Sequence, residues 1–259
     1  ETPERWGEFL RYQYFKFDFS SVTQSGIYVL TYGDSESNIF IIGNDIFDRH
    51  VWQPTLEYFL PVQMCHMRVN DRYRVWHGLC HMDDALMAPV DTVHIDGYYQ
   101  GSSTLTSFKS YEHVPGLNAG GWHDAGDYDL RVESQAGTVY VLSLIKEAFN
   151  VDYDETTVDQ KNHLVEMHMP DGKQDILQQI EHGVISILSG YKSLGRLYRG
   201  IICPMLRQYV LLGDGVNMTD NIIDHKISST ANAGYGPEII DDRWVFTENN
   251  PRRELFVSG

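Results

Sequence analysis

The sequence is poor in cysteine, in basic residues and in long apolar runs, and each shortage excludes a class of protein. Three cysteines among 259 residues are too few for a disulfide scaffold, and an odd number cannot pair completely. Lys and Arg number 20 against 36 Asp and Glu, so the formal charge is −16. Because such a chain repels phosphates, we expect neither a nucleic-acid nor an anionic-membrane partner.

Long apolar segments are missing as well. The longest apolar runs are four or five residues, whereas a membrane-spanning helix needs about 20, so we expect no membrane insertion. The first residues, Glu1 to Trp6, are polar and lack the charged and apolar regions of a signal peptide. The sequence therefore predicts a soluble globular protein that begins as a mature or trimmed polypeptide.

The first 46 residues predict short strands. Phe15, Phe17 and Phe19 alternate with polar residues, which is the period of a half-buried strand. Apolar runs at 27–30 and 39–42 are bounded by turn residues. Three strands are too few to close a sandwich, so we expect either a small sheet beside the next domain or a chain cut inside a sandwich.

From about residue 48 the apolar spacing changes to that of helices. The predicted helices lie at 54–65, at 135–149, at 174–191 and from 251 onward. Residues 66–122 show little periodicity and predict long ordered loops, which in compact domains are often functional. The predicted fold class is therefore mainly α.

Residues 120–128 read Gly-Gly-Trp-His-Asp-Ala-Gly-Asp-Tyr. Asp124 and Asp127 can converge on one point because Gly126 between them tolerates tight backbone geometry. Paired carboxylates suit glycoside hydrolysis, in which one group acts as a base while another acts as an acid. An ordinary turn with two solvated aspartates explains the same spacing.

This segment resembles the signature of glycoside hydrolase family 9, the inverting cellulases and related β-glucan hydrolases. Residues 48–59, which include Trp-Gln-Pro-Thr-Leu-Glu-Tyr-Phe, look like the first helix of the family's barrel, and Cys-His-Met-Asp-Asp-Ala at 80–85 is also similar. The match at 175–183 is looser. Residues 192–259 match no motif of the family.

The resemblance implies a fold and a division of the chain. Residues 1–46 would be the C-terminal strands of an immunoglobulin-like β-sandwich, and residues 47–259 the N-terminal half of an (α/α)6 barrel, so that the chain looks truncated at both ends. The implied activity is hydrolysis of β-1,4-glucosidic bonds in β-glucan oligo- or polysaccharides. The implied location is secreted, periplasmic or at the cell surface.

The resemblance also implies roles for the two aspartates. Asp127 would be the general base that takes a proton from the attacking water, and Asp124 would hold that water and orient the base. In an inverting enzyme the acid lies about 6.5–9.5 Å from the base. In the family the acid is a late Glu, and we expect this chain to lack it, because no such motif surrounds the late glutamates Glu238, Glu248 and Glu254.

Aromatic residues are numerous, with 5 Trp, 16 Tyr and 11 Phe. Such side chains either stack on sugars or fill the core. Within the motif, Trp122 and Tyr128 are the candidate substrate-binding residues. Tyr128 is followed by Asp-Leu-Arg, where the family commonly has Gly-Lys-Tyr. The sequence therefore does not identify which glycan is bound.

Cys65, Cys80, His81 and His123 form a second candidate site. Two thiolates and two imidazoles satisfy the tetrahedral coordination of a structural zinc. Some family 9 members bind zinc through a Cys, a Cys-His pair and the His before the first motif aspartate. A disulfide between the two cysteines, or a His123 that only hydrogen-bonds the backbone, stays open. His66 is an adjacent candidate ligand.

Calcium is the other cofactor considered. Asp83-Asp84 and Asp241-Asp242 are acidic pairs that could help to hold calcium, which some family members bind, although solvated acidic pairs are commoner. The third cysteine, Cys203, is predicted to be a buried thiol.

Two further functions stay open. The chain could be a non-catalytic carbohydrate-binding protein on the same fold. It could also be a zinc-stabilised helical interaction module, in which the two aspartates are incidental.

Overall fold

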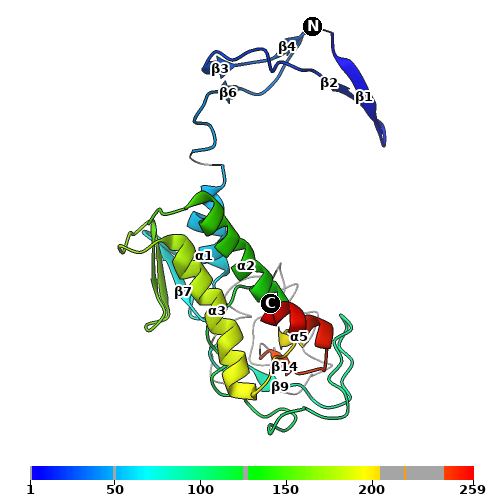
Figure 1. The fold of residues 1–259 in the computed structure, drawn as a ribbon, viewed down its shortest axis with the longest axis vertical. Helices are drawn as coiled ribbons and strands as arrows, with labels where there is room; N and C mark the ends of the chain where they lie inside the picture. Colours follow the sequence, from blue (N-terminus) through cyan, green and yellow to red (C-terminus); the bar gives the residue numbers. More distant parts are fainter. Residues whose placement is uncertain (1, 49–50, 125–127, 205–218, 220–241) are drawn as a thin grey trace. The chain divides into compact units, whose positions relative to one another are not determined.

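The structure is a computed structural model that describes residues 2–48, 51–124, 128–204, 219 and 242–259. The chain divides into two units, Glu1–Pro54 and Thr55–Gly259. Strands make up the first unit, and the second contains the helices and two further sheets (Figure 1). The residues that carry the predicted chemistry all belong to the second unit.

The first unit consists of short antiparallel pairs. β1 pairs with β2, β3 with β6 and β4 with β5. Their bounds are Glu4–Phe9, Tyr12–Lys16, Gly26–Tyr28, Thr31–Tyr32, Ser35–Glu36 and Phe40–Ile42. The predicted strands at 27–30 and 39–42 are found as β3 and β6, whereas the strand predicted across Phe15 to Phe19 ends at Lys16. Phe40 packs against Phe19, with ring centroids 5.3 Å apart.

The helices of the second unit lie close to the predicted positions. A π-helical turn, η1, leads into α1 where the first helix was expected, and α2 and α3 run side by side (Figure 1). Their bounds, with that of the last helix α5, are Thr55–Phe59, Leu60–Gln63, Val132–Phe149, Asp175–Leu194 and Pro251–Ser258. Asn150 ends α2 and Gly195 ends α3 in the left-handed conformation, with φ of 48° and 70°, which is the usual way for a helix to stop.

The prediction of a mainly α fold is wrong for the described residues, because two four-stranded sheets accompany the helices. One has the order β11-β12-β7-β8 and the other β10-β13-β14-β9. In that order, their bounds are Thr156–Asp159, Leu164–Met167, Arg68–Asp71 and Arg74–His77, then Leu130–Arg131, Gly200–Ile202, Trp244–Phe246 and Leu86–Met87. β7 pairs with β12 and β9 with β14, each in parallel. Strands of two to four residues are too short to show a periodicity, and several of them pair with strands far along the chain.

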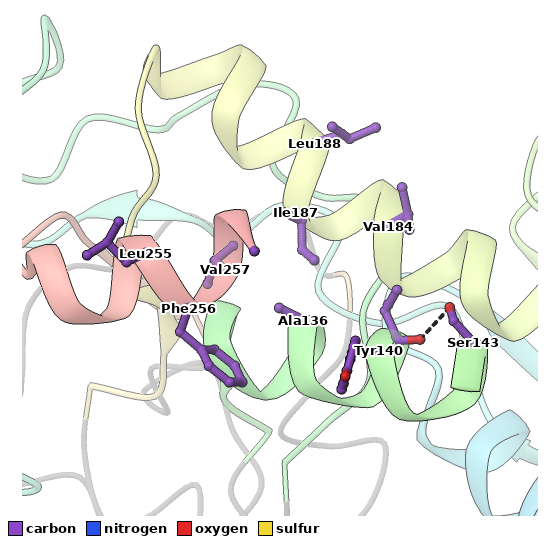
Figure 2. Close-up of a pocket in the computed structure, with 11 residues that line it drawn as sticks. Ala136, Tyr140, Ser143, Val184, Ile187, Leu188, Leu255, Phe256 and Val257 are labelled. Atoms are coloured by element: carbon purple, nitrogen blue, oxygen red, sulfur yellow. Dashed lines mark hydrogen bonds between the residues drawn. The ribbon is translucent and has the colours of Figure 1, made fainter. Parts of the chain in front are cut away.

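The core of the second unit follows these elements. One buried cluster joins Leu56 and Leu60 of the first helical segment to α2, α3 and the first sheet, and another surrounds the second sheet. An apolar pocket lies between α2, α3 and α5, and the described residues that line it include no Asp, Glu, His or Cys (Figure 2). None of the helices in the described part of the chain has the length and apolar composition that a membrane span needs.

Asp175, the first residue of α3, connects that helix to the sheet. Its carboxylate accepts hydrogen bonds from the backbone amides of Glu155 and Thr156, both at 3.0 Å. Its own amide donates to the carbonyl of Tyr153 at 3.1 Å. The side chain is buried, and burial raises the pKa of Asp175 to about 7, against the lowering effect of the two backbone amides.

This raised pKa predicts a pH-dependent stability. Between the ordinary value of 3.8 and about 7, the folded chain holds a proton that the unfolded chain has released. The contribution of Asp175 to the free energy of unfolding is therefore fully present below about pH 4 and is lost as the pH rises toward 7. We expect the free energy of unfolding of the wild type to fall over this range relative to Asp175→Asn, whose amide oxygen still accepts hydrogen bonds but does not titrate. Urea unfolding at stepped pH measures the difference, and a flat difference would contradict the prediction.

Candidate active site and metal centre

The glycine-rich segment is held against the end of the first helix by main-chain hydrogen bonds. The amide of Cys65 donates to the carbonyl of Gly121 at 2.8 Å, and the amide of His123 donates to the carbonyl of Gln63 at 2.8 Å. Met64 and Trp122 form an antiparallel bridge between these two bonds. This short ladder places Cys65 beside His123, although many residues separate them in the sequence.

The two glycines of the segment allow it to approach α3 closely. Gly120 and Gly121 have φ of +68° and +88°, and a Cβ on Gly120 would lie 2.3 Å from the carbonyl oxygen of His182. The Nε2 of His182 donates to the Gly121 carbonyl at 2.8 Å. Burial lowers the pKa of His182 to about 3, so this imidazole is neutral and serves as a fixed donor. No residue with a side chain fits at Gly120 without moving the helix.

Trp122 lies in the core. Its side chain is 5% exposed, its indole Nε1 donates to Gln179 Oε1 at 2.8 Å, and its main chain exchanges hydrogen bonds with the Gln135 amide at 2.9 and 3.0 Å. A Cβ on Gly183 would meet the indole at 2.5 Å. This environment is that of a packing residue, and the substrate-binding role predicted for Trp122 stays a prediction.

The structure brings the four predicted metal ligands together. One ligand atom from each of Cys65, Cys80, His81 and His123 lies within 4.8 Å of all the others, and all four side chains are buried. The sulfurs are 4.0 Å apart, His81 Nδ1 is 3.4 Å from Cys65 Sγ, and His123 Nε2 is 3.8 Å from Cys80 Sγ. The edges of a tetrahedron around zinc, with bonds of about 2.0 Å to nitrogen and 2.3 Å to sulfur, are about 3.3–3.8 Å. These three distances lie within a few tenths of an ångström of the edges of such a tetrahedron, and the two cysteines are not disulfide-bonded in this structure.

The protonation of these groups suits metal binding. Burial lowers the pKa of His81 well below its usual value, and burial lowers that of His123 as well. Burial alone would raise the pKa of the Cys80 thiol, but the hydrogen bond with Cys65 and the nearby Arg243 charge lower it. Neutral imidazoles and readily ionised thiols are the forms that coordinate zinc. His81 Nε2 is also buried with no hydrogen-bond partner among the described residues.

Asp124 follows the ligand His123 directly. Its carboxylate is partly exposed and lies 3.4 Å from the Nε of Arg131. Its amide donates to the carbonyl of Asp129 at 3.0 Å, so the two ends of the loop between them are held together. Asp127, the predicted base, lies outside the described residues.

Tyr128 packs over the metal ligands. Its ring centroid is 4.9 Å from that of His123 and 5.8 Å from that of His81. Its φ of 59° is uncommon for a residue with a side chain and is typical of constrained functional loops. Tyr128 thus connects the loop that carries the aspartates to the Cys/His cluster.

Sequence reasoning missed Arg243. This side chain is fully buried and is ion-paired with Asp84. One aspartate of the predicted calcium-binding pair Asp83-Asp84 therefore has an arginine as its partner, and calcium binding stays a hypothesis. Asp241, in the other predicted pair, lies outside the described residues. Charged residues are rarely buried without a partner, but no local pattern distinguishes a buried arginine from an exposed one.

The other residues considered in the sequence are a histidine, a cysteine and three late glutamates. His66 hydrogen-bonds the carbonyl of Gly120 at 2.9 Å through Nδ1 and is not one of the four clustered ligands. Cys203 is a buried thiol, as predicted. The carboxylates of Glu248 and Glu254 are paired with arginines, at 2.7 Å from Arg253 and 3.2 Å from Arg196. Glu238 lies outside the described residues.

Comparison with known proteins confirms the resemblance to glycoside hydrolase family 9. A cellodextrinase of Butyrivibrio fibrisolvens is 28% identical over 145 residues, which cover 53% of this chain and 22% of the relative. A metagenome-derived family 9 endoglucanase has a TM-score of 0.54 at 20% identity, covering 90% of this chain and 34% of its own. A Zn-binding triple mutant of the family 9 endoglucanase J30 has a TM-score of 0.54 at 20% identity, and the match covers 89% of this chain and 35% of the mutant's chain.

These likenesses concern the fold of one part of longer proteins. No family model matches the chain, and the identity to the solved structures is 20%. The chain spans about a third of the length of those structures and about a fifth of the cellodextrinase.

The contact of Gly120 with α3 predicts the effect of adding one methyl group. We expect Gly120→Ala to lower the free energy of unfolding by about 1–3 kcal/mol more than a matched glycine replacement, because the new Cβ overlaps backbone that cannot move alone. Gly172→Ala is the control, since Gly172 has φ of +85° but nothing within 4 Å of a Cβ. Urea unfolding of both variants separates steric overlap from backbone strain, and equal losses would contradict the packing described.

Proposed function

We propose that this chain is part of a family 9 glycoside hydrolase that cleaves β-1,4-glucosidic bonds of cellulose-like β-glucans with inversion. The observation that carries the proposal is the position of the motif. His123 lies in a buried cluster of four metal-type ligands, and Asp124 beside it is partly exposed. A rigid buried anchor next to an accessible carboxylate is the arrangement that positioned acid–base chemistry requires.

In this proposal the two aspartates act on one water molecule. Asp127 takes a proton from the water as it attacks the anomeric carbon, and Asp124 accepts a hydrogen bond from the same water. The amide of Asp124 donates to the carbonyl of Asp129 at 3.0 Å, which holds together the two ends of the segment that carries both aspartates. The general acid is a glutamate that we do not assign within this chain.

The proposed metal is a structural zinc held by Cys65, Cys80, His81 and His123. Four protein ligands complete a tetrahedral shell and leave no position for a reacting water. Zinc would supply a crosslink between the end of the first helix and the residue before Asp124. Tyr128, whose ring lies on two of the ligands, is the residue of the loop that we place next to bound sugar.

We also propose a division of the chain on the same basis. Residues 1–46 would be strands of an immunoglobulin-like domain, and residues 47–259 would belong to an (α/α)6 catalytic barrel. The protein would act outside the cytoplasm, where its polymeric substrate is found.

The first test concerns the base. We expect Asp127→Asn to reduce the release of reducing sugar from β-1,4-glucan oligosaccharides by about 10²–10⁴-fold, because general-base catalysis contributes that much. The assay uses the full natural polypeptide, and chromatography of the products gives the anomeric configuration. Asp159→Asn is the matched control, since Asp159 accepts hydrogen bonds from backbone amides in an exposed turn where Asn also fits.

The outcomes separate the possible functions. Binding of β-glucan without hydrolysis by the wild type would favour a carbohydrate-binding protein. Neither binding nor hydrolysis, with zinc present, would favour a zinc-stabilised interaction module. Retention of configuration would contradict the inverting mechanism.

The second test concerns the metal. We expect one zinc per chain by elemental analysis after dialysis without chelator, and loss of that zinc in Cys65→Ser and in Cys80→Ser. Cys203→Ser is the control, because Cys203 is equally buried but is not among the four clustered ligands. Chelation should lower the melting temperature, because a ligand that binds the folded state stabilises it.

Proteolysis tests the structural role of the metal independently. If zinc anchors the loop, its removal should increase cleavage within residues 120–128. An unchanged melting temperature together with unchanged cleavage would refute the anchoring role. Zinc that persists in both serine variants would refute the assigned ligand set.

A further inference from the structure

Arg243 is the largest fully buried side chain of the second unit's described part, and its guanidinium connects three separate segments. It is ion-paired with Asp84 through Nε. One terminal nitrogen donates to the carbonyl of Tyr128 at 2.6 Å, and the other lies 3.4 Å from the Sγ of Cys65. The latter nitrogen is also 3.4 Å from the Nε2 of His66. A single planar group thus contacts a proposed metal ligand and the loop that carries the aspartates.

The pairing of two strands in the second sheet fixes the position of Arg243. β14 begins at the next residue and pairs in parallel with β9, with Trp244 opposite Leu86. The carbonyl of Arg243 accepts a hydrogen bond from the Leu86 amide at 3.1 Å. Arg243 lies one residue before β14 and Asp84 two residues before β9, so this register brings the two side chains together at the start of the paired strands. The backbone of Arg243 is therefore fixed independently of the loop that it contacts.

Stability alone does not account for this arginine. A buried ion pair contributes little compared with apolar residues of similar volume, because both charges lose their hydration. Arginine differs from lysine in offering five donors in a rigid plane. The contacts with Tyr128 and Cys65 use this plane, whereas the pair with Asp84 alone needs only a charge.

We infer that Arg243 is a positioning residue that fixes the backbone at Tyr128 relative to Cys65, and thereby couples the metal centre to the loop of Asp124 and Asp127. The inference rests on the proposed function for its catalytic consequence. The hydrogen bond to the Tyr128 carbonyl acts on the residue next to the proposed base. The contact of 3.4 Å with the Cys65 sulfur holds that ligand toward the others, as outer-shell donors do at metal sites.

The test compares Arg243→Lys with Arg199→Lys in the full natural polypeptide. Lysine keeps the charge opposite Asp84 but cannot reach all three segments. Arg199 is the matched control because it too is largely buried and ion-paired, with Glu133 and Glu248, in contacts that do not involve the cluster. Three quantities are measured: zinc affinity by chelator competition, amide exchange along the chain, and kcat and KM on β-glucan oligosaccharides.

For Arg243→Lys we expect about a 10-fold or greater loss of zinc affinity, the usual effect of losing an outer-shell partner. Amide exchange should become faster at residues 128–131 while α2 keeps its protection. The value of kcat should fall with KM unchanged, because Arg243 is fully buried and acts only through the loop. Arg199→Lys should leave all three quantities at their wild-type values.

Unchanged zinc affinity together with unchanged amide exchange at residues 128–131 would overturn the inference. A uniform increase of amide exchange across the second unit would overturn it as well, because that result indicates a purely structural role. If Arg243→Lys does not fold, Asp84→Asn/Arg243→Met removes both buried charges and is judged by the same measurements. A wild type without glucanase activity would refute the proposed function, whereas zinc affinity and amide exchange would still decide the role of Arg243.

Discussion

The ladder of main-chain hydrogen bonds between residues 63–65 and 121–123 is the constraint on which the rest of the site depends. It joins the end of the first helix to the glycine-rich segment and so places Cys65 beside His123. The same segment presses against α3 at Gly120, where only a glycine fits. Because the backbone is held from both sides, the residue that follows, Asp124, begins the loop from a fixed position.

The cluster beside this ladder concentrates polar groups where a protein usually buries apolar ones. Burial of thiols, imidazoles and an arginine is costly unless each finds a partner, and the donor spacing suits a tetrahedral metal. His66, His81, Ala85 and Tyr128 adopt positive φ around the cluster. Such conformations persist only where the surroundings fix them, and they gather at functional sites. Stability and site geometry therefore depend on the same few residues.

Helices were predictable and sheets were not, for a physical reason. Apolar residues recur on one face within 174–191, and residues 135–149 combine apolar and helix-forming residues in one short window, so the sequence predicts both helices close to the observed bounds of α3 and α2. β7 and β9 are each completed by a partner far along the chain. β7 also pairs with its neighbour β8, but strands of two to four residues are too short to show a periodicity, so the segment that contains them has the pattern of loops.

The sequence by itself determined the chemistry that is possible: a pair of aspartates three residues apart, two thiols and two imidazoles in a usable order, and a resemblance to one hydrolase family. Tertiary structure decided which of these groups meet. It gathered the four ligands within 4.8 Å, buried Trp122 in the core and brought Arg243 from a distant strand to the aspartate loop. Residue types and local spacing are properties of the chain, whereas contacts between distant segments exist only after the sheets and helices have packed.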